Sequence, residues 1–189
     1  MAQFTKQALI DAFLTILETK ALDKITVKDI VEKCNVNRNT FYYHFQDIYD
    51  LIEEIVTMEA EKITTIYPIY ESWQKGLEDT MIYILDNSTS ILNVYHSVRK
   101  EQLEQFLYKI TDKFLVDYIN KASEGFNATE KDKIFISKFY RYAIVGTILE
   151  WIEKGLTEDP TELSRQMVKI LEGSIHEDLE KIEKKGVSI

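Results

Sequence analysis

Apolar residues recur three or four positions apart along almost the whole chain, the spacing that places them on one face of an α-helix. The first such stripe consists of Leu9, Ala12, Phe13, Ile16 and Leu17. Only two prolines and six glycines interrupt the chain, and this scarcity of helix-breaking residues disfavours a β fold with many turns. We therefore predict an all-α protein of about nine helices.

Polar residues that can cap a helix divide the first part of the chain into one helix followed by two short ones. The three predicted helices cover residues 4–20, 27–34 and 38–45. Thr26 can cap the second helix, with Asp29 as its capping-box partner, and Asn37 can cap the third. Asn35, in the turn between them, tolerates a left-handed backbone. Together these features outline a helix-turn-helix domain.

Six more helices are predicted after residue 46. They cover roughly residues 48–65, 72–87, 90–97, 101–121, 130–154 and 160–176. Asp47, Thr129 and Asp159 are the expected N-caps of three of them, and Gly155 is a left-handed stop. The charged tail EDLEKIEKKGVSI, from Glu177, is expected to fray. We assign residues 1–47 to the helix-turn-helix domain and residues 48–189 to a C-terminal helical bundle domain.

Composition and charge narrow the class of protein. Hydrophobic residues make up 45% of the chain and charged residues 29%, as in ordinary soluble globular proteins. Because there is neither a signal-peptide pattern nor an apolar run of membrane length, we expect a cytoplasmic protein that does not associate with membranes. The net charge is −9, but residues 1–50 carry only −1 of it, with six Lys and Arg against seven Asp and Glu. Net charge bears on solubility rather than on what one local surface binds.

The segment NRNTFYYHF, residues 37–45, interleaves aromatic, amide and hydroxyl side chains on one short helix. At 100° per residue, Phe41 and Phe45 share one side and can bury against the first two helices. The remaining side chains point outward or lie at the edges: Arg38, Asn39, Thr40, Tyr42, Tyr43 and His44. Such side chains can bind base edges and phosphate oxygens of DNA. Thr26 and Lys28, at the positive end of the second helix, can add a phosphate contact.

An alternative interpretation of this segment stays open at this point. Tyr42, Tyr43 and His44 can also be half-buried packing residues between two layers of helices. Their spacing alone does not decide between packing and DNA binding.

The run ITVKDIVEKCNVNRNTFYYHFQDIYDL resembles the DNA-binding signature of the TetR family of transcriptional regulators. The matching features are Thr26-Val27, Ile30, the turn at 35–37 and the run Thr-Phe-Tyr-Tyr-His-Phe at 40–45. The resemblance covers about residues 5–55. It implies a homodimer that places two such helices in successive major grooves of a pseudopalindromic operator on double-stranded DNA. The DNA-facing positions that it implies are Thr26, Arg38, Asn39, Thr40, Tyr42, Tyr43 and His44.

Two residues depart from the family pattern. Asn35 stands where the turn usually carries Gly, which is physically tolerable because Asn also adopts left-handed conformations. Ile48 stands where members commonly carry a Lys that binds a phosphate. That contact is either missing or moved to Gln46 or Tyr49.

The C-terminal half carries a weaker resemblance. The segments SWQKGLEDTMIYILDN and FISKFYRYAIVGTILEWIEKG are similar to the branch of the family that includes activators of dihydroxyacetone kinase operons. In the family this half usually holds an effector pocket and the dimer interface. We expect regulation there by a small-molecule effector or a protein co-regulator.

Aromatic residues with polar tips supply candidates for the effector pocket. The candidate residues are Trp73, Tyr83, Tyr95, Tyr108, Phe139 and Tyr142. For any single ring, the favoured alternative is that it simply fills the helical core.

Small and apolar residues on the last two helices supply candidates for the dimer interface, because small side chains let a partner helix approach closely. The candidates are Ala143, Gly146, Thr147, Met167, Ile170, Leu171 and Ser174. Four helices from two chains would then form a bundle. The alternative is that these residues pack within one chain.

Other classes of protein find little support. The glycines form no phosphate-binding motif, and the histidines pair with no acid at a metal-binding spacing. The single cysteine, Cys34, excludes an intramolecular disulfide and disfavours a zinc site. We therefore expect no enzyme activity, no metal and no cofactor. A helical adaptor that lacks sequence-specific DNA binding remains the alternative, because Ile48 and the nearly neutral N-terminal segment are compatible with it.

Overall fold

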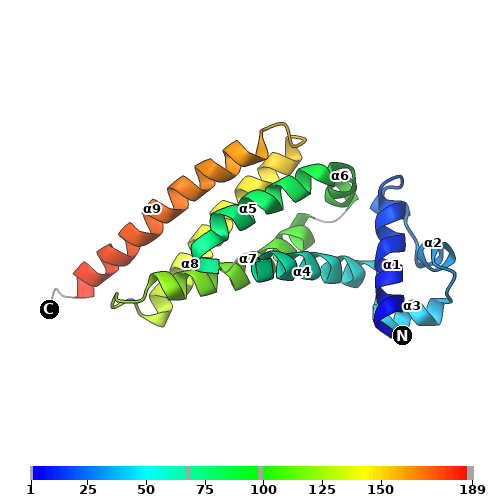
Figure 1. The fold of residues 1–189 in the computed structure, drawn as a ribbon, viewed down its shortest axis with the longest axis horizontal. Helices are drawn as coiled ribbons and strands as arrows, with labels where there is room; N and C mark the ends of the chain where they lie inside the picture. The colour runs from blue at the N-terminus through cyan, green and yellow to red at the C-terminus, as the bar shows by residue number, and fades with distance from the viewer. Residues whose placement is uncertain (1, 67–68, 98–99, 187–189) are drawn as a thin grey trace. The chain divides into compact units, whose positions relative to one another are not determined.

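The computed structural model describes residues 2–66, 69–97 and 100–186 (Figure 1). These residues form nine α-helices and one turn of 3-10 helix, with no strand among them, which confirms the all-α prediction. The elements before residue 67 are α1 (Ala2–Leu17), η1 (Leu22–Lys24), α2 (Val27–Lys33), α3 (Arg38–His44) and α4 (Ile48–Ile66). The later helices are α5 (Ile69–Asp86), α6 (Ser88–Ser97), α7 (Lys100–Ala122), α8 (Glu130–Glu153) and α9 (Pro160–Gly186).

The short helices start and stop where the sequence predicts. Asp29 N donates to Thr26 Oγ1 at 3.2 Å, and the Asp29 carboxylate accepts from Thr26 N at 2.7 Å, so the capping box is complete. Asn37 Oδ1 accepts from Thr40 N at 2.9 Å and caps α3. Asn35 has a φ of 55°, the left-handed conformation that its place in the turn requires. These local bonds set the turn between α2 and α3.

The longer helices use the same devices. Asp47 and Asp159 each accept from a backbone N–H three residues on, and Thr129 with Asp132 forms a second capping box. Gly155 ends α8 with a φ of 78°, as predicted. Each of these caps satisfies backbone N–H or C=O groups that a helix end leaves unpaired.

The chain divides into two compact units. The first contains residues 1–61 and 87–103, and its core includes Leu9, Phe13 and Ile30, none more than 1% exposed. Within this unit, Asn93 on α6 donates to the carbonyl of Leu17 at 2.9 Å and so ties α6 to α1. Packing units need not coincide with functional domains, so the division between residues 1–47 and 48–189 stays a prediction.

The second unit contains residues 62–86 and 104–189. Its core includes Met81, Ile119 and Trp151, and α5 packs along α9 (Figure 1). The Trp151 indole N–H donates to the carbonyl of Glu158 at 3.0 Å, so this large ring is buried without losing its hydrogen bond.

The predicted fraying of the tail is wrong as far as Gly186, where α9 ends. Leu179 lies beyond the predicted break and is completely buried. It continues the stripe of Leu171 and Ile175 at intervals of four residues, so one apolar face of α9 keeps packing although its other faces are charged.

Candidate nucleic-acid interface

Two phenylalanines hold α3 in the first unit. Phe41 is completely buried and Phe45 nearly so, and their ring centroids lie 5.6 Å apart. Both belong to the core that α1 and α2 also supply. The predicted inward side of α3 is therefore confirmed, and packing on that side holds the helix in the unit.

The other side of α3 faces solvent. Tyr43 is 77% exposed and Tyr42 57% exposed, and Arg38 and Asn39 are exposed as well. The packing interpretation of the two tyrosines is therefore wrong for this chain. His44 is half-buried at the edge of α3, and its ring meets that of Tyr43 edge-on with centroids 5.0 Å apart.

The hydroxyl groups of the two threonines already have partners. Thr26 Oγ1 donates to the Asp29 carboxylate at 2.7 Å, and Thr40 Oγ1 donates to Asn37 Oδ1 at 3.1 Å. A hydroxyl has one hydrogen to donate, so neither can donate to a phosphate while these bonds persist. Thr26 and Thr40 thus act first as parts of helix caps. Lys28 is exposed, with its Nζ 3.7 Å from Glu32.

Hydrogen bonds from two residues lower the pKa of the Asp29 carboxyl. Lys20 Nζ donates to its carboxylate at 2.8 Å, in addition to the two bonds from Thr26. Hydrogen bonds from Lys20 and then from Thr26 lower the pKa of Asp29 to about 2. The carboxylate at the start of α2 therefore stays charged at neutral pH.

The position at which the family resemblance implies a lysine is apolar and faces inward. Ile48 is half-buried and packs against the core of the first unit. Gln46 and Tyr49, the two suggested substitutes, are exposed and carry no positive charge.

A cation that the sequence did not reveal lies beside the C-terminal end of α3. Lys6, on α1, has its Nζ 2.5 Å from the carboxylate of Glu54 on α4 and 5.8 Å from the centroid of the Phe45 ring. It borders an open groove of about 530 Å³ lined by residues of α1, α3 and α4. The residues that line this groove are Lys6, Gln7, Ile10, Tyr43, His44, Glu54 and Met58. Because Lys6 and Glu54 lie on helices that are far apart in the sequence, no local pattern points to this pair.

In the part of the chain that the structure describes, the aromatic residues proposed for an effector pocket lie in different places, and the pocket stays a prediction. Phe139 is 61% exposed, Tyr142 is 52% exposed and Tyr83 also reaches the surface. Tyr95 belongs to the first unit, and the Trp73 side chain lies outside the described residues. The rings of Tyr108 and Tyr142 meet edge-on, with centroids 5.2 Å apart.

The guanidinium of Arg141 joins this pair of rings. Its centre lies 4.7 Å from the Tyr108 ring centroid and 4.8 Å from that of Tyr142, and it donates to the Asp112 carboxylate at 2.6 Å. Cation–π contacts and an ion pair therefore link α7 to α8 here. The two rings are part of this link.

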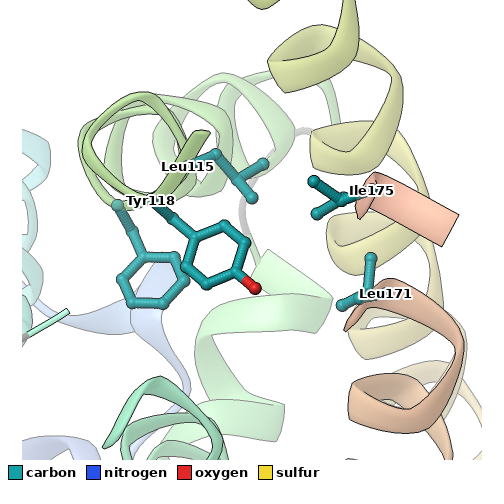
Figure 2. Close-up of a pocket in the computed structure, with 5 residues that line it drawn as sticks. Leu115, Tyr118, Leu171 and Ile175 are labelled. Atoms are coloured by element: carbon teal, nitrogen blue, oxygen red, sulfur yellow. The ribbon is translucent and has the colours of Figure 1, made fainter. Parts of the chain in front are cut away.

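A small apolar cavity does lie between α7 and α9 (Figure 2). Leu115 and Tyr118 from α7 face Leu171 and Ile175 from α9, and Phe114 completes the lining. The cavity holds about 10 Å³, roughly the space of one water molecule. Ligand pockets in proteins occupy several hundred Å³, so a metabolite enters here only if these helices separate.

The residues proposed for a dimer interface divide into two groups. Met167 and Leu171 are buried within their own chain, as the packing alternative holds. Ala143 and Gly146 on α8 are exposed, and Ile170 on α9 is 66% exposed. Thr147 and Ser174 are partly exposed, and each hydroxyl donates to a carbonyl one turn earlier in its own helix.

Large apolar side chains that the sequence did not assign to an interface extend the exposed group. Phe135 is 69% exposed, and its spacing places it with Phe139, Tyr142 and Gly146 on one side of α8. Adjacent large apolar residues on a surface mark an interaction site more often than isolated ones do. We call this surface the α8 face; it comprises Phe135, Phe139, Tyr142, Ala143 and Gly146.

Metal binding and membrane insertion find no support in the part of the chain that the structure describes. No three His, Cys, Asp or Glu side chains gather there in a way that could hold a metal ion. Among the same residues, every helix is too short or too polar to cross a membrane.

Family models match both parts of the chain. The model of bacterial regulatory proteins of the tetR family matches residues 9–55. A second TetR model, described as a transcriptional regulator C-terminal region, matches residues 71–173 and so covers more than half of the chain by itself.

Individual proteins show the same relationship. The chain is 24% identical over 171 residues to the HTH-type dhaKLM operon transcriptional activator DhaS of Lactococcus lactis subsp. lactis (strain IL1403), with 88% of each chain covered. It is 25% identical over 177 residues to the uncharacterized HTH-type transcriptional regulator YxbF of Bacillus subtilis (strain 168), covering 89% of this chain and 44% of that protein. The solved structure of the dihydroxyacetone kinase operon activator DhaS superposes with a TM-score of 0.71 at 23% identity, covering 90% of this chain and 96% of that one. A TetR transcriptional regulator from Streptococcus agalactiae 2603V gives a TM-score of 0.58 at 19% identity, with 90% and 94% covered. These two structures support the fold.

Proposed function

The chain belongs to the TetR family of transcriptional regulators, and from this premise we propose that it is a homodimer that binds a pseudopalindromic operator sequence-specifically through α3. Regulators of this family bind DNA and are not enzymes. The observation that carries the proposal is the division of α3 into a buried side, held by Phe41 and Phe45, and an exposed side of polar and aromatic residues.

Each exposed side chain suits a particular contact with the duplex. Arg38 can donate two hydrogen bonds to a guanine edge, and Asn39 can pair with adenine. The hydroxyls of Tyr42 and Tyr43 and the ring N–H of His44 can donate to phosphates, which positions the helix without reading sequence. Lys28 adds a flexible cation at the start of α2, while Thr26 and Thr40 contribute through the caps that hold α2 and α3 in place.

We propose that the homodimer forms through the α8 face together with Ile170. An exposed surface of two phenylalanines and a tyrosine loses apolar area from water when a second copy covers it. Gly146 and Ala143 among these rings let a partner helix approach closely. We therefore propose that Phe139 and Tyr142 belong to this interface rather than to an effector pocket.

We further propose that residues 48–189 receive a regulatory signal, from a small-molecule effector or a protein co-regulator, and that residues 1–47 hold the DNA-binding function. The small size of the α7–α9 cavity means that a small effector would have to separate packed helices, which would move the ends of those helices. A regulator of this kind works where the genome is, so the proposed location is the cytoplasm.

Selection from a random-sequence duplex library tests the DNA-binding proposal, because it requires no candidate operator. The wild-type protein should enrich a sequence with two inverted half-sites and bind it with a steep dependence on salt. Arg38→Ala and Tyr42→Ala should each weaken binding by about tenfold or more while leaving the melting temperature nearly unchanged.

The alternative, a helical adaptor, predicts a different result in this selection experiment. A folded dimer that enriches no sequence, and that binds duplex only as weakly as an unrelated acidic protein, would favour the adaptor. If Tyr42→Ala fails to fold, the result would support a packing role for the Tyr42 side chain.

A further inference from the structure

The end of α3 lacks the cation that a phosphate contact at this point would use. Ile48 is apolar and packs inward, and Gln46 and Tyr49 carry no positive charge. The Gln46 backbone N–H, a second group able to bind an anion, donates to the Asp50 carboxylate at 2.8 Å. A contact with a DNA phosphate at this end of α3 therefore requires a cation from another part of the chain.

Lys6 lies in the right place to supply that cation. Its Nζ is 5.8 Å from the centroid of the ring of Phe45, the C-cap residue of α3, and Lys6 lines the same groove as Tyr43 and His44. Both of these residues are proposed phosphate donors. The side chain of Lys6 is 33% exposed, so it is not sealed in the core.

The groove holds one competing anion. Glu54 accepts from Lys6 Nζ at 2.5 Å, and its side chain is 35% exposed. Gln7, also in the groove, donates its amide to Asp11 at 2.9 Å on α1 itself. Among the residues that line the groove, Lys6 and Glu54 are thus the two with a fixed charge, and they neutralise each other.

We infer that Lys6 is a phosphate-binding residue of the DNA interface and that Glu54 occupies, in the free protein, the place that a backbone phosphate of DNA takes in the complex. An ion pair at this exposure is weak, so a lysine with a flexible stem can exchange one anionic partner for another. This inference rests on the proposed function, and it makes α1 a contributor to the interface along with α2 and α3.

Because Glu54 and a DNA phosphate compete for Lys6, substitutions of Lys6 and of Glu54 should have opposite effects on the affinity for DNA. Lys6→Met keeps the apolar stem and removes the charge, so affinity should fall by about three- to tenfold and the slope of log K against log salt should become shallower by about 0.9, the value of one phosphate contact. Lys6→Arg should restore most of both. Glu54→Gln removes the competitor and should raise affinity at every salt concentration.

The test uses the full-length protein and the duplex enriched by the wild type. Affinity is measured by fluorescence anisotropy at four or more salt concentrations, with Lys121→Met as a matched control, because Lys121 forms a comparable surface pair with Glu124 just beyond α7. The control should leave the slope unchanged. Melting temperatures of all variants show whether each one folds.

A role in stability alone predicts a different result, because both Lys6→Met and Glu54→Gln would then lower the melting temperature and weaken binding together. That outcome, or an unchanged salt slope in Lys6→Met, overturns the inference while leaving the proposed function in place if Arg38→Ala still weakens binding. If the wild type enriches no duplex, the proposed function fails and the inference fails with it.

Discussion

Three donors converge on the carboxylate of Asp29. Lys20 Nζ, Thr26 N and Thr26 Oγ1 all lie within 2.8 Å of it. The carboxylate therefore ties the end of the α1 region to the start of α2. Because α2 leads through a short turn into α3, this one side chain helps to set the direction from which α3 is presented.

Replacing Asp29 with Asn should destabilise the protein in a pH-dependent manner. A carboxyl whose pKa is lowered from 3.8 to about 2 on folding contributes stability above the unfolded value, and that contribution disappears as the pH falls toward 2. The side chain is one-third exposed, so screening by water limits the effect, and we expect a loss of about 1 kcal/mol at pH 7.

Urea unfolding of the wild type and Asp29→Asn at pH 7, 5, 3.5 and 2.5 measures this effect. The difference in unfolding free energy should shrink steadily below pH 5. Asp23→Asn is the control, since Asp23 pairs with its neighbour Lys24 and is more exposed. An equal difference at pH 7 and pH 2.5 would rule out the carboxylate charge as the cause.

At the scale of single residues, the sequence predicts the interactions that form between residues close together in the chain. The caps at Thr26, Asn37 and Thr129 are confirmed because each partner lies three residues away. The pairs Lys20–Asp29 and Lys6–Glu54 were not predicted. They depend on where segments that are separate in the sequence come to lie, which residue types and spacing do not specify.

Among the helices, α9 packs against its own chain even where its sequence is highly charged. Leu179 is completely buried, and one residue earlier Asp178 accepts a hydrogen bond from the Tyr140 hydroxyl at 2.9 Å. Burial and this bond raise the pKa of Tyr140. The density of charge after Glu177 suggested a solvated tail, whereas one apolar residue per turn is enough to hold the helix.

Leu179→Ala should therefore lower the free energy of unfolding by about 2–5 kcal/mol, the cost of emptying a buried leucine site. Chemical denaturation followed by circular dichroism measures the change. Lys181→Ala, on an exposed side of the same helix, should change stability by less than about 0.5 kcal/mol. If the two variants are equally stable, this part of α9 does not pack as described.

The α8 face makes a prediction about assembly. Phe139→Glu places a charge in the middle of the proposed interface, where a partner would have to bury it, so the dimer should dissociate at least about tenfold more readily. Analytical ultracentrifugation over a range of protein concentrations gives the dissociation constant.

Val116→Glu is the matched control, because Val116 is an exposed apolar residue on α7, outside the α8 face. It should leave the dimer intact. Equal dissociation constants for Phe139→Glu and the wild type would mean that another surface joins the chains. Sequence alone could not separate these roles, because aromatic periodicity marks an apolar face without telling whether the same chain or another covers it.

For the whole molecule, helical periodicity and caps were sufficient for the fold class, whereas the effector pocket was not predictable. A pocket is the space that packed side chains leave. Here Phe139 is 61% exposed, the Tyr142 ring packs against Tyr108 and Arg141, and the α7–α9 cavity holds only about 10 Å³. The charge distribution matters at this scale too. With a net charge of −9, the protein as a whole repels DNA, so tight binding needs both copies of α3 at matched half-sites.

This requirement predicts a strict dependence on half-site spacing. Inserting about five base pairs, half a helical turn, between the half-sites of the enriched duplex moves one of them to the opposite face, where the second α3 cannot reach it. Affinity should fall by about 100-fold, a typical scale for losing one of two linked contacts.

The Phe139→Glu variant, if monomeric, should bind weakly and show no dependence on the insertion. Titration of both proteins against both duplexes measures this coupling, and equal binding of the two duplexes by the wild type would mean that each chain finds its half-site independently.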